Sequence, residues 1–143
     1  MSKKTKSNLE FTNEINIIKD TIETLKRQNK LTSIIIVGAS GSGKSKLSKA
    51  INLKIHQSLL IDAGLMSSYK IQSLETPDFS IKSNTCIIDG AEYFTKYCLS
   101  QLLYFIRKRN SLILLSTHIG DLPQELISAS TCFELDKGLH LIE

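Results

Sequence analysis

The residues best suited to chemistry stand together from Gly38 to Ser45, where the sequence reads GASGSGKS. Glycine lets a loop turn without a Cβ clash, so that successive backbone N–H groups can converge on one oxyanion. Lys44 adds a mobile positive charge, and the Ser45 hydroxyl is a suitable ligand for Mg²⁺. A plain Gly/Ser-rich turn would explain Gly38 and Gly43, but not a lysine and a hydroxyl in adjacent fixed positions. The stretch therefore predicts a site for nucleotide phosphates.

The spacing Gly-x-x-x-x-Gly-Lys-Ser is the Walker A motif, which needs a strand before it and a helix after it. Both are expected here, because the apolar run SIIIV precedes the motif and a helical pattern follows it. The expected cofactors are ATP or ADP with Mg²⁺. The predicted phosphate-binding residues are Gly38, Ala39, Ser40, Gly41, Ser42, Gly43, Lys44, Ser45 and Lys46. Lys46 also fits a plain exposed position on the helix.

An acid at the end of an apolar strand is the second feature of the candidate site. The run CIID ends in Asp89, which we assign to the magnesium together with Ser45, although Asp at this point also suits the start of a helix. Many ATPases with a Walker A motif place a glutamate directly after this acid, where the chain has Gly90. Glu92 is the nearest acid and could orient the attacking water. A glutamate that stabilises the dipole of the following helix is an equal alternative.

Polar residues also follow the apolar run SLILL, where the sequence continues STH. In open α/β sheets ligands bind beyond the carboxyl ends of the strands, so Thr117 or His118 could contact the γ-phosphate. An ordinary polar exit from a strand is the alternative. The predicted catalytic set is Lys44, Asp89, Glu92, Thr117 and His118.

Strands and helices alternate around these residues. Helices are expected over 12–29, 44–55 and 91–109, with shorter ones over 65–74 and after Pro123. Strands are expected over 33–37, 57–61, 85–89 and 111–118, and the final two strands are TCFEL and LHLIE around the turn DKG. Continuous apolar strands are typical of a parallel sheet covered on both faces. We therefore expect an α/β fold with three α/β/α layers and a mostly parallel sheet of about five strands, the architecture that the resemblance to P-loop NTPases described below also implies.

The chain has 143 residues and a formal net charge of +4, which is room for one domain with one core. Residues 1–10 are expected to be a flexible basic lead-in, and residues 11–143 a single domain. No apolar run approaches the roughly 20 residues that span a bilayer. No apolar segment follows the basic start, so a cytoplasmic protein is expected. Three scattered cysteines and three scattered histidines indicate buried free thiols rather than disulfides or a zinc site.

With these motifs the chain resembles the P-loop NTPases, and more narrowly the AAA+ group around the bacterial initiator DnaA and the regulatory inactivator Hda. The resemblance covers residues 13–143 and rests on GASGSGKS, SLLID, IIDGAE, LLSTH and the ending DLPQELISASTCFEL. It implies an ATP/ADP-binding module with weak ATPase activity. It also implies that the nucleotide state regulates docking to a protein partner, another AAA+ protein or a replication factor, in replication initiation or its control.

The sequence departs from that family at two points. Ser130 stands where the family's LxSR motif has an arginine, and no arginine follows it. The sequence also stops where the family's helical lid would begin, so a core without a lid is expected. The oligomeric state stays open.

Two other enzyme classes remain as alternatives. One is a small P-loop kinase acting on a nucleotide or small molecule. The other is an ABC-type ATPase, whose LSGGQ-like signature is absent from this sequence. DNA contact through the basic residues at 3–6 and 107–109 is a secondary expectation.

Overall fold

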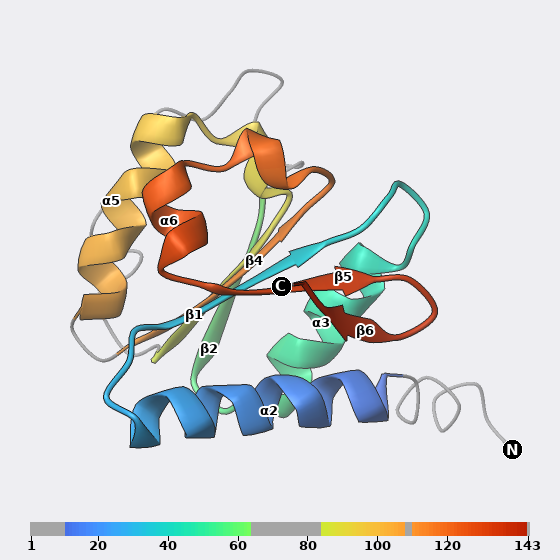
Figure 1. The fold of residues 1–143 in the computed structure, drawn as a ribbon. Helices are drawn as coiled ribbons and strands as arrows, with labels where there is room; N and C mark the ends of the chain where they lie inside the picture. The colour runs from blue at the N-terminus through green and yellow to red at the C-terminus, as the bar shows by residue number, and fades with distance from the viewer. Residues whose placement is uncertain (1–10, 64–83, 108–109, 143) are drawn as a thin grey trace, which may run out of the picture.

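The computed structural model describes residues 11–63, 84–107 and 110–142, which build one six-stranded sheet with helices on both faces (Figure 1). The strands are β1 (Thr32–Val37), β2 (Ser58–Asp62), β3 (Thr85–Asp89), β4 (Ser111–Ser116), β5 (Thr131–Leu135) and β6 (Leu139–Leu141). The α-helices are α2 (Thr12–Arg27), α3 (Lys44–Lys54), α5 (Lys96–Arg107) and α6 (Gln124–Ser128). Two short 3₁₀ turns are η2 (Ala91–Tyr93) and η3 (Ile119–Asp121). The segments at 1–10 and 65–74 lie outside the described residues.

The strand order is β2-β3-β4-β1-β5-β6, and the first five strands in this order are parallel. The last strand pairs antiparallel with β5 through a tight turn at residues 136–138. The predicted α/β class with a mostly parallel sheet is therefore confirmed, with six strands in place of about five. The sixth strand, β6, falls within the predicted strand LHLIE and pairs with β5 as a hairpin at the edge of the sheet.

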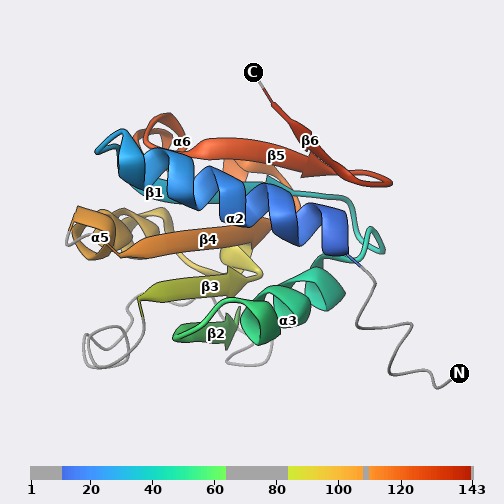
Figure 2. The ribbon, with the colours of Figure 1, turned by 90° about the horizontal axis from the view of Figure 1, so that it is seen from below.

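The sheet separates two apolar layers, because successive side chains of a strand point to opposite faces. Ile34 and Ile36 of β1 pack in the cluster that includes α2 and α3, whereas Ile35 packs with α5 and α6. Figure 2 shows α2 and α3 crossing in front of the strands on one side of the sheet. Burial of β1, β3 and β4 on both faces explains their continuous apolar sequences.

One predicted helix is interrupted in the structure. The sequence pattern indicated a single helix over 91–109, but the chain forms η2, then an extended residue at Phe94, and begins α5 at Lys96. The Thr95 hydroxyl accepts a hydrogen bond from the Cys98 N–H at 3.1 Å, as an N-cap residue does. Phe94 is fully buried in the core. Packing of Phe94 and capping by Thr95 therefore explain why the helix begins again at Lys96. Residues 108–109, at the end of the predicted helix, lie outside the described residues.

The three cysteines, Cys86, Cys98 and Cys132, are free and buried, as the sequence indicated. Burial raises the pKa of the Cys86 thiol to about 12, and it also raises the pKa of the Cys132 thiol. Such thiols stay protonated near neutral pH and are poor nucleophiles. Among the described residues, no helix is both long enough and apolar enough to cross a membrane.

Candidate functional site

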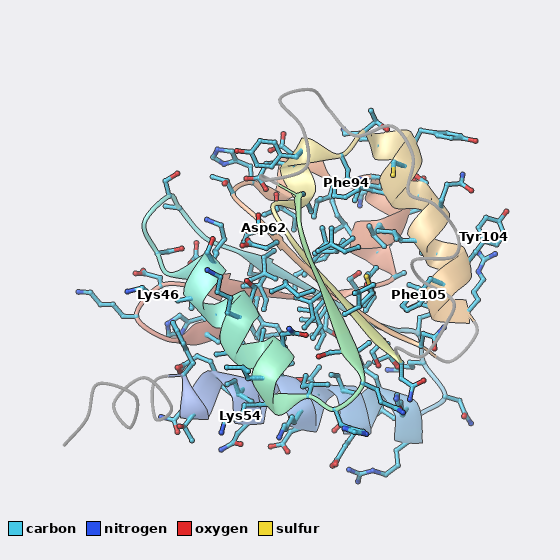
Figure 3. All side chains as sticks on the ribbon, turned by 180° about the vertical axis from the view of Figure 1, so that it is seen from behind. Lys46, Lys54, Asp62, Phe94, Tyr104 and Phe105 are labelled. Atoms are coloured by element: carbon cyan, nitrogen blue, oxygen red, sulfur yellow. The ribbon has the colours of Figure 1, made fainter. Side chains whose placement is uncertain are left out.

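A cleft of about 480 Å³ lies at the edge of the sheet where the parallel strands end. Its lining residues are Ser40, Gly41, Gly43, Lys44, Ser45, Lys46, Asp62, Asp89, Gly90, Glu92, Tyr93 and Thr117. They come from the ends of β2, β3 and β4 and from the loop and helix that follow β1. In Figure 3, Lys46 at the start of α3 and Asp62 at the end of β2 mark this edge. Residues far apart in the sequence therefore meet in one polar cleft.

The loop after β1 is shaped by backbone contacts. The Gly38 N–H donates to the Ser116 carbonyl at 3.1 Å, which anchors the start of the loop beside the end of β4. The Ser42 N–H donates to the Ala39 carbonyl at 3.0 Å, so the loop turns back on itself. Gly43 precedes α3 with a φ of 101°, a left-handed conformation that favours glycine. The unpaired N–H groups at the start of α3 then face the cleft with the positive end of the helix dipole.

Lys44 lies over this loop. Its Nζ donates to the Gly38 carbonyl at 2.5 Å and to the Ala39 carbonyl at 3.1 Å. The side chain is only partly exposed, and it lines the cleft. An ammonium group bonded to two loop carbonyls therefore lies at the loop, next to the start of α3. The position suits a cation that attracts phosphate oxygens into the loop.

Asp89 ends β3 and is 7% exposed. The Ser48 Oγ of α3 lies 3.4 Å from its Oδ2, and the same hydroxyl donates to the Ser45 carbonyl at 2.8 Å. Among the described residues, no other protein donor bonds to this carboxylate. A buried carboxylate with so few partners, beside an exposed serine hydroxyl, offers the hard oxygen ligands that Mg²⁺ prefers. The donor set of Ser45 and Asp89 therefore fits the expected ion.

The described residues hold no group of three or more His, Cys, Asp or Glu side chains that could enclose a metal. A magnesium site with one or two protein ligands is consistent with this, because Mg²⁺ usually keeps water and substrate phosphates in its coordination shell.

Glu92 reaches the cleft from the 3₁₀ turn η2. Gly90 has a φ of 88°, and this left-handed turn directs the chain back toward the end of β4. There the Thr117 hydroxyl donates to the Glu92 Oε2 at 2.7 Å. The Glu92 Oε1 is buried and has no hydrogen-bond partner. A carboxylate oxygen in this state is available to a water or ligand in the cleft.

The structure separates the two polar residues after β4. Thr117 lines the cleft, whereas His118 is exposed and is not part of the lining. The His118 carbonyl accepts a hydrogen bond from the Ser116 hydroxyl at 3.2 Å. The predicted site residues Gly38, Ala39 and Ser42 belong to the loop but likewise stand outside the lining. Every other predicted site residue lines the cleft.

Two side chains that line the cleft, and a third that contacts one of its residues, were not predicted as site residues. Asp62 ends β2 directly beside Asp89 in the sheet register, and an acid at a strand end could have signalled it had the predicted strand not stopped at 61. Tyr93 lines the cleft beside Gly90, where an added Cβ would lie 3.0 Å from the Tyr93 Cδ2. Ser48 contacts Asp89 from α3, and the helical pattern alone gives no signal for that contact.

Ser130, where the family resemblance leads one to expect an arginine, lies at the opposite edge of the sheet, before β5. Its Oγ is 2.7 Å from the Ser33 Oγ, and it donates to the Leu126 carbonyl at 2.6 Å. Its hydroxyl is satisfied within the chain and contacts no residue of the cleft.

The sequence matches no protein-family model and no curated protein. Solved structures do match. The RuvB Holliday junction branch migration motor of Thermotoga maritima superposes with a TM-score of 0.55 and 17% identity, over 87% of this chain and 45% of the RuvB chain. A single-residue variant of RuvB gives 19% identity and the same TM-score, over 87% of this chain and 46% of that chain.

The chain shares the P-loop NTPase fold of these RuvB structures. In this P-loop fold, β4 lies between β1, which leads to the phosphate loop, and β3, which ends in Asp89. Thr117 therefore leaves the sheet between the loop and the acid. The chain spans less than half the length of the RuvB chains that it matches.

Proposed function

We propose that this chain binds ATP and ADP with Mg²⁺ in the cleft and hydrolyses ATP slowly. The observation that carries the proposal is the position of the GASGSGKS loop, which lies between β1 and α3 at the same sheet edge as Asp89. The P-loop fold supports it, because this loop and a helix N-terminus form an anion site in such folds.

The phosphates would lie against the loop N–H groups. Lys44 would exchange its bonds to the Gly38 and Ala39 carbonyls for bonds to phosphate oxygens, which stabilises their charge. Ser45 and Asp89 would hold Mg²⁺, with Asp62 nearby. When bound, the ion neutralises charge on the β- and γ-phosphates.

Hydrolysis would depend on Glu92. Its buried, unpartnered Oε1 would orient the attacking water, while the Thr117 hydroxyl holds the other oxygen in place. The sequence after Arg109 contains no arginine that could stabilise the transferred phosphoryl group. An arginine supplied by a partner can raise such rates by about 10³–10⁵. Slow turnover of the chain alone is therefore expected.

We also propose that the chain is a regulatory module. The resemblance to the DnaA and Hda group supports a role in which the bound nucleotide controls docking to a protein partner in the cytoplasm. That partner would be another AAA+ protein or a replication factor, and it could supply the arginine. The same setting makes DNA a secondary partner through the basic residues of the chain.

The test is calorimetric titration of the chain with ATP and ADP, with and without Mg²⁺. Wild type is expected to bind both nucleotides more tightly with Mg²⁺. Lys44→Ala should weaken ATP binding by at least about tenfold, since bonds to charged groups are worth about 1.5–3 kcal/mol. Lys49→Ala, an exposed lysine on α3 outside the cleft lining, is the matched control and should bind normally.

Two results would overturn the proposal. If the Lys44→Ala variant bound ATP as tightly as wild type, the loop would not be a phosphate-binding site. Transfer of phosphate from ATP to a panel of nucleosides and nucleotides, rather than to water, would identify a kinase in place of an ATPase.

A further inference from the structure

Ser48 is a fully buried polar residue on the face of α3 that packs against the sheet. The other buried residues of this helix, Leu47 and Ile51, are apolar and belong to the core cluster beside β3. A hydroxyl in such surroundings is destabilising unless it is hydrogen-bonded. We therefore expect the Ser48 hydroxyl to have a hydrogen-bond partner at the contact between α3 and the sheet.

The hydroxyl has two acceptors within reach. The Ser48 Oγ is 2.8 Å from the Ser45 carbonyl oxygen and 3.4 Å from the Asp89 Oδ2. A serine hydroxyl has one proton and donates to one acceptor at a time. The Ser45 carbonyl and the Asp89 carboxylate are therefore alternative acceptors of the same proton, and rotation of the hydroxyl switches it from one to the other.

The contact matters because Asp89 has few constraints. Among the described residues, Ser48 is the one protein donor near its carboxylate. The hydroxyl also joins two parts of the site, since it touches the backbone of Ser45 on one side and the Asp89 side chain on the other.

We infer that Ser48 is a positioning residue for the magnesium-binding acid, an inference that rests on the proposed function. When its hydroxyl turns from the Ser45 carbonyl to Asp89, it donates to the Oδ2 and leaves the other carboxylate oxygen for the ion. Partners of this kind orient metal ligands, and their removal typically lowers metal affinity by about 10- to 100-fold. The contrasting role is packing alone, in which a small side chain merely lets α3 approach β3.

The test measures ATP binding to the full chain by calorimetry over a series of Mg²⁺ concentrations and in EDTA. The affinity for ATP is expected to rise with the Mg²⁺ concentration. The Mg²⁺ concentration that gives half of this rise should be about tenfold higher for Ser48→Ala than for wild type, near the lower limit for such contacts. The affinity of the variant in EDTA should equal that of wild type. Ser100→Ala is the matched control, because the hydroxyl of Ser100 on α5 lies near the Lys96 carbonyl and the carboxylate of Glu125 on α6, outside the cleft lining.

A second variant and a double substitution protect the test against a folding defect. Ser48→Cys keeps a side chain of similar size with a weaker donor, and it should give a smaller rise of the same sign. In the Asp89→Asn background, Ser48→Ala should have no further effect on the Mg²⁺ dependence.

The inference is overturned if Ser48→Ala leaves the Mg²⁺ dependence unchanged, or weakens binding equally with Mg²⁺ and in EDTA. A wild-type chain that binds no ATP under either condition would instead refute the proposed function, so the two failures are distinguishable.

Discussion

The two edges of the sheet carry similar polar residues but treat them differently. At the amino ends of the strands, Ser33 and Ser130 bond to each other, and Ser130 also bonds to a backbone carbonyl. At the carboxyl ends, Asp89 has a single donor at 3.4 Å, and one oxygen of Glu92 is buried without a partner. At the amino edge these hydroxyls are hydrogen-bonded within the chain, whereas at the carboxyl edge carboxylate oxygens beside the cleft have few or no partners.

This difference in hydrogen bonding between the two edges indicates where a ligand is expected. Native proteins pair almost all of their buried polar groups, so the unpaired Glu92 Oε1 in the lining of the cleft indicates a function rather than a stabilising contact. Two other buried hydroxyls among the described residues have no partner, Ser42 Oγ in the loop before α3 and Ser111 Oγ at the amino edge. Neither lines the cleft, and Ser111 is the one described residue at the amino edge with such an atom.

The largest expected effect comes from removing the charge of Glu92. Glu92→Gln should lower the rate of ATP hydrolysis by about 100-fold, because general-base catalysis contributes about 10²–10⁴. The amide still accepts the Thr117 hydrogen bond, so affinity for ATP should change little. Phosphate release and calorimetry measure the two quantities.

The matched control for Glu92→Gln is Glu125→Gln, since Glu125 also accepts a hydrogen bond from a hydroxyl, that of Ser100 at 2.8 Å, but lies outside the cleft lining. An unchanged hydrolysis rate in Glu92→Gln would mean that the open acceptor at this edge has no catalytic role, and the contrast between the edges would then concern binding alone.

An intermediate effect is expected at the turn that delivers Glu92. Gly90→Ala places a Cβ at a φ of 88° and 3.0 Å from the Tyr93 ring. The left-handed conformation alone costs a residue with a side chain about 1–2 kcal/mol, so the free energy of unfolding should fall by at least that amount. Chemical denaturation measures this change.

Gly120→Ala is the control for the turn, because nothing lies within 4 Å of a Cβ at Gly120 and its φ is not positive. If both variants were equally stable, the strained turn would not be needed to bring Glu92 to the cleft.

The smallest effect is expected at the amino edge. Ser33→Ala removes the hydrogen bond to Ser130 and should lower the free energy of unfolding by about 1 kcal/mol, without changing nucleotide affinity. Ser111→Ala removes a hydroxyl without a partner and should be neutral or slightly stabilising. A change of nucleotide affinity in Ser33→Ala would show that the two edges are coupled, which the contrast between them does not predict.

Much of the fold followed from local patterns. The apolar runs are short-range signals for β1, β3 and β4, and the turn DKG is one for the hairpin of β5 and β6. The structure has all five of these strands. The interruption before α5 had no such signal, because Phe94 and Cys98 are spaced as in one continuous helix. Both side chains are buried in the same core cluster, so the periodic pattern is the same with or without the break.

The sequence by itself determined the phosphate loop and the acid, because a strand, a glycine-rich loop, Lys44 and a helix form one contiguous unit whose chemistry is local. Only the tertiary structure decided which distant groups join that unit. It brought Thr117 to Glu92, left His118 exposed, and set Asp62 and Ser48 beside Asp89. The physical reason is that strand order and helix packing fix these contacts, and neither is contained in the spacing of residues along the chain.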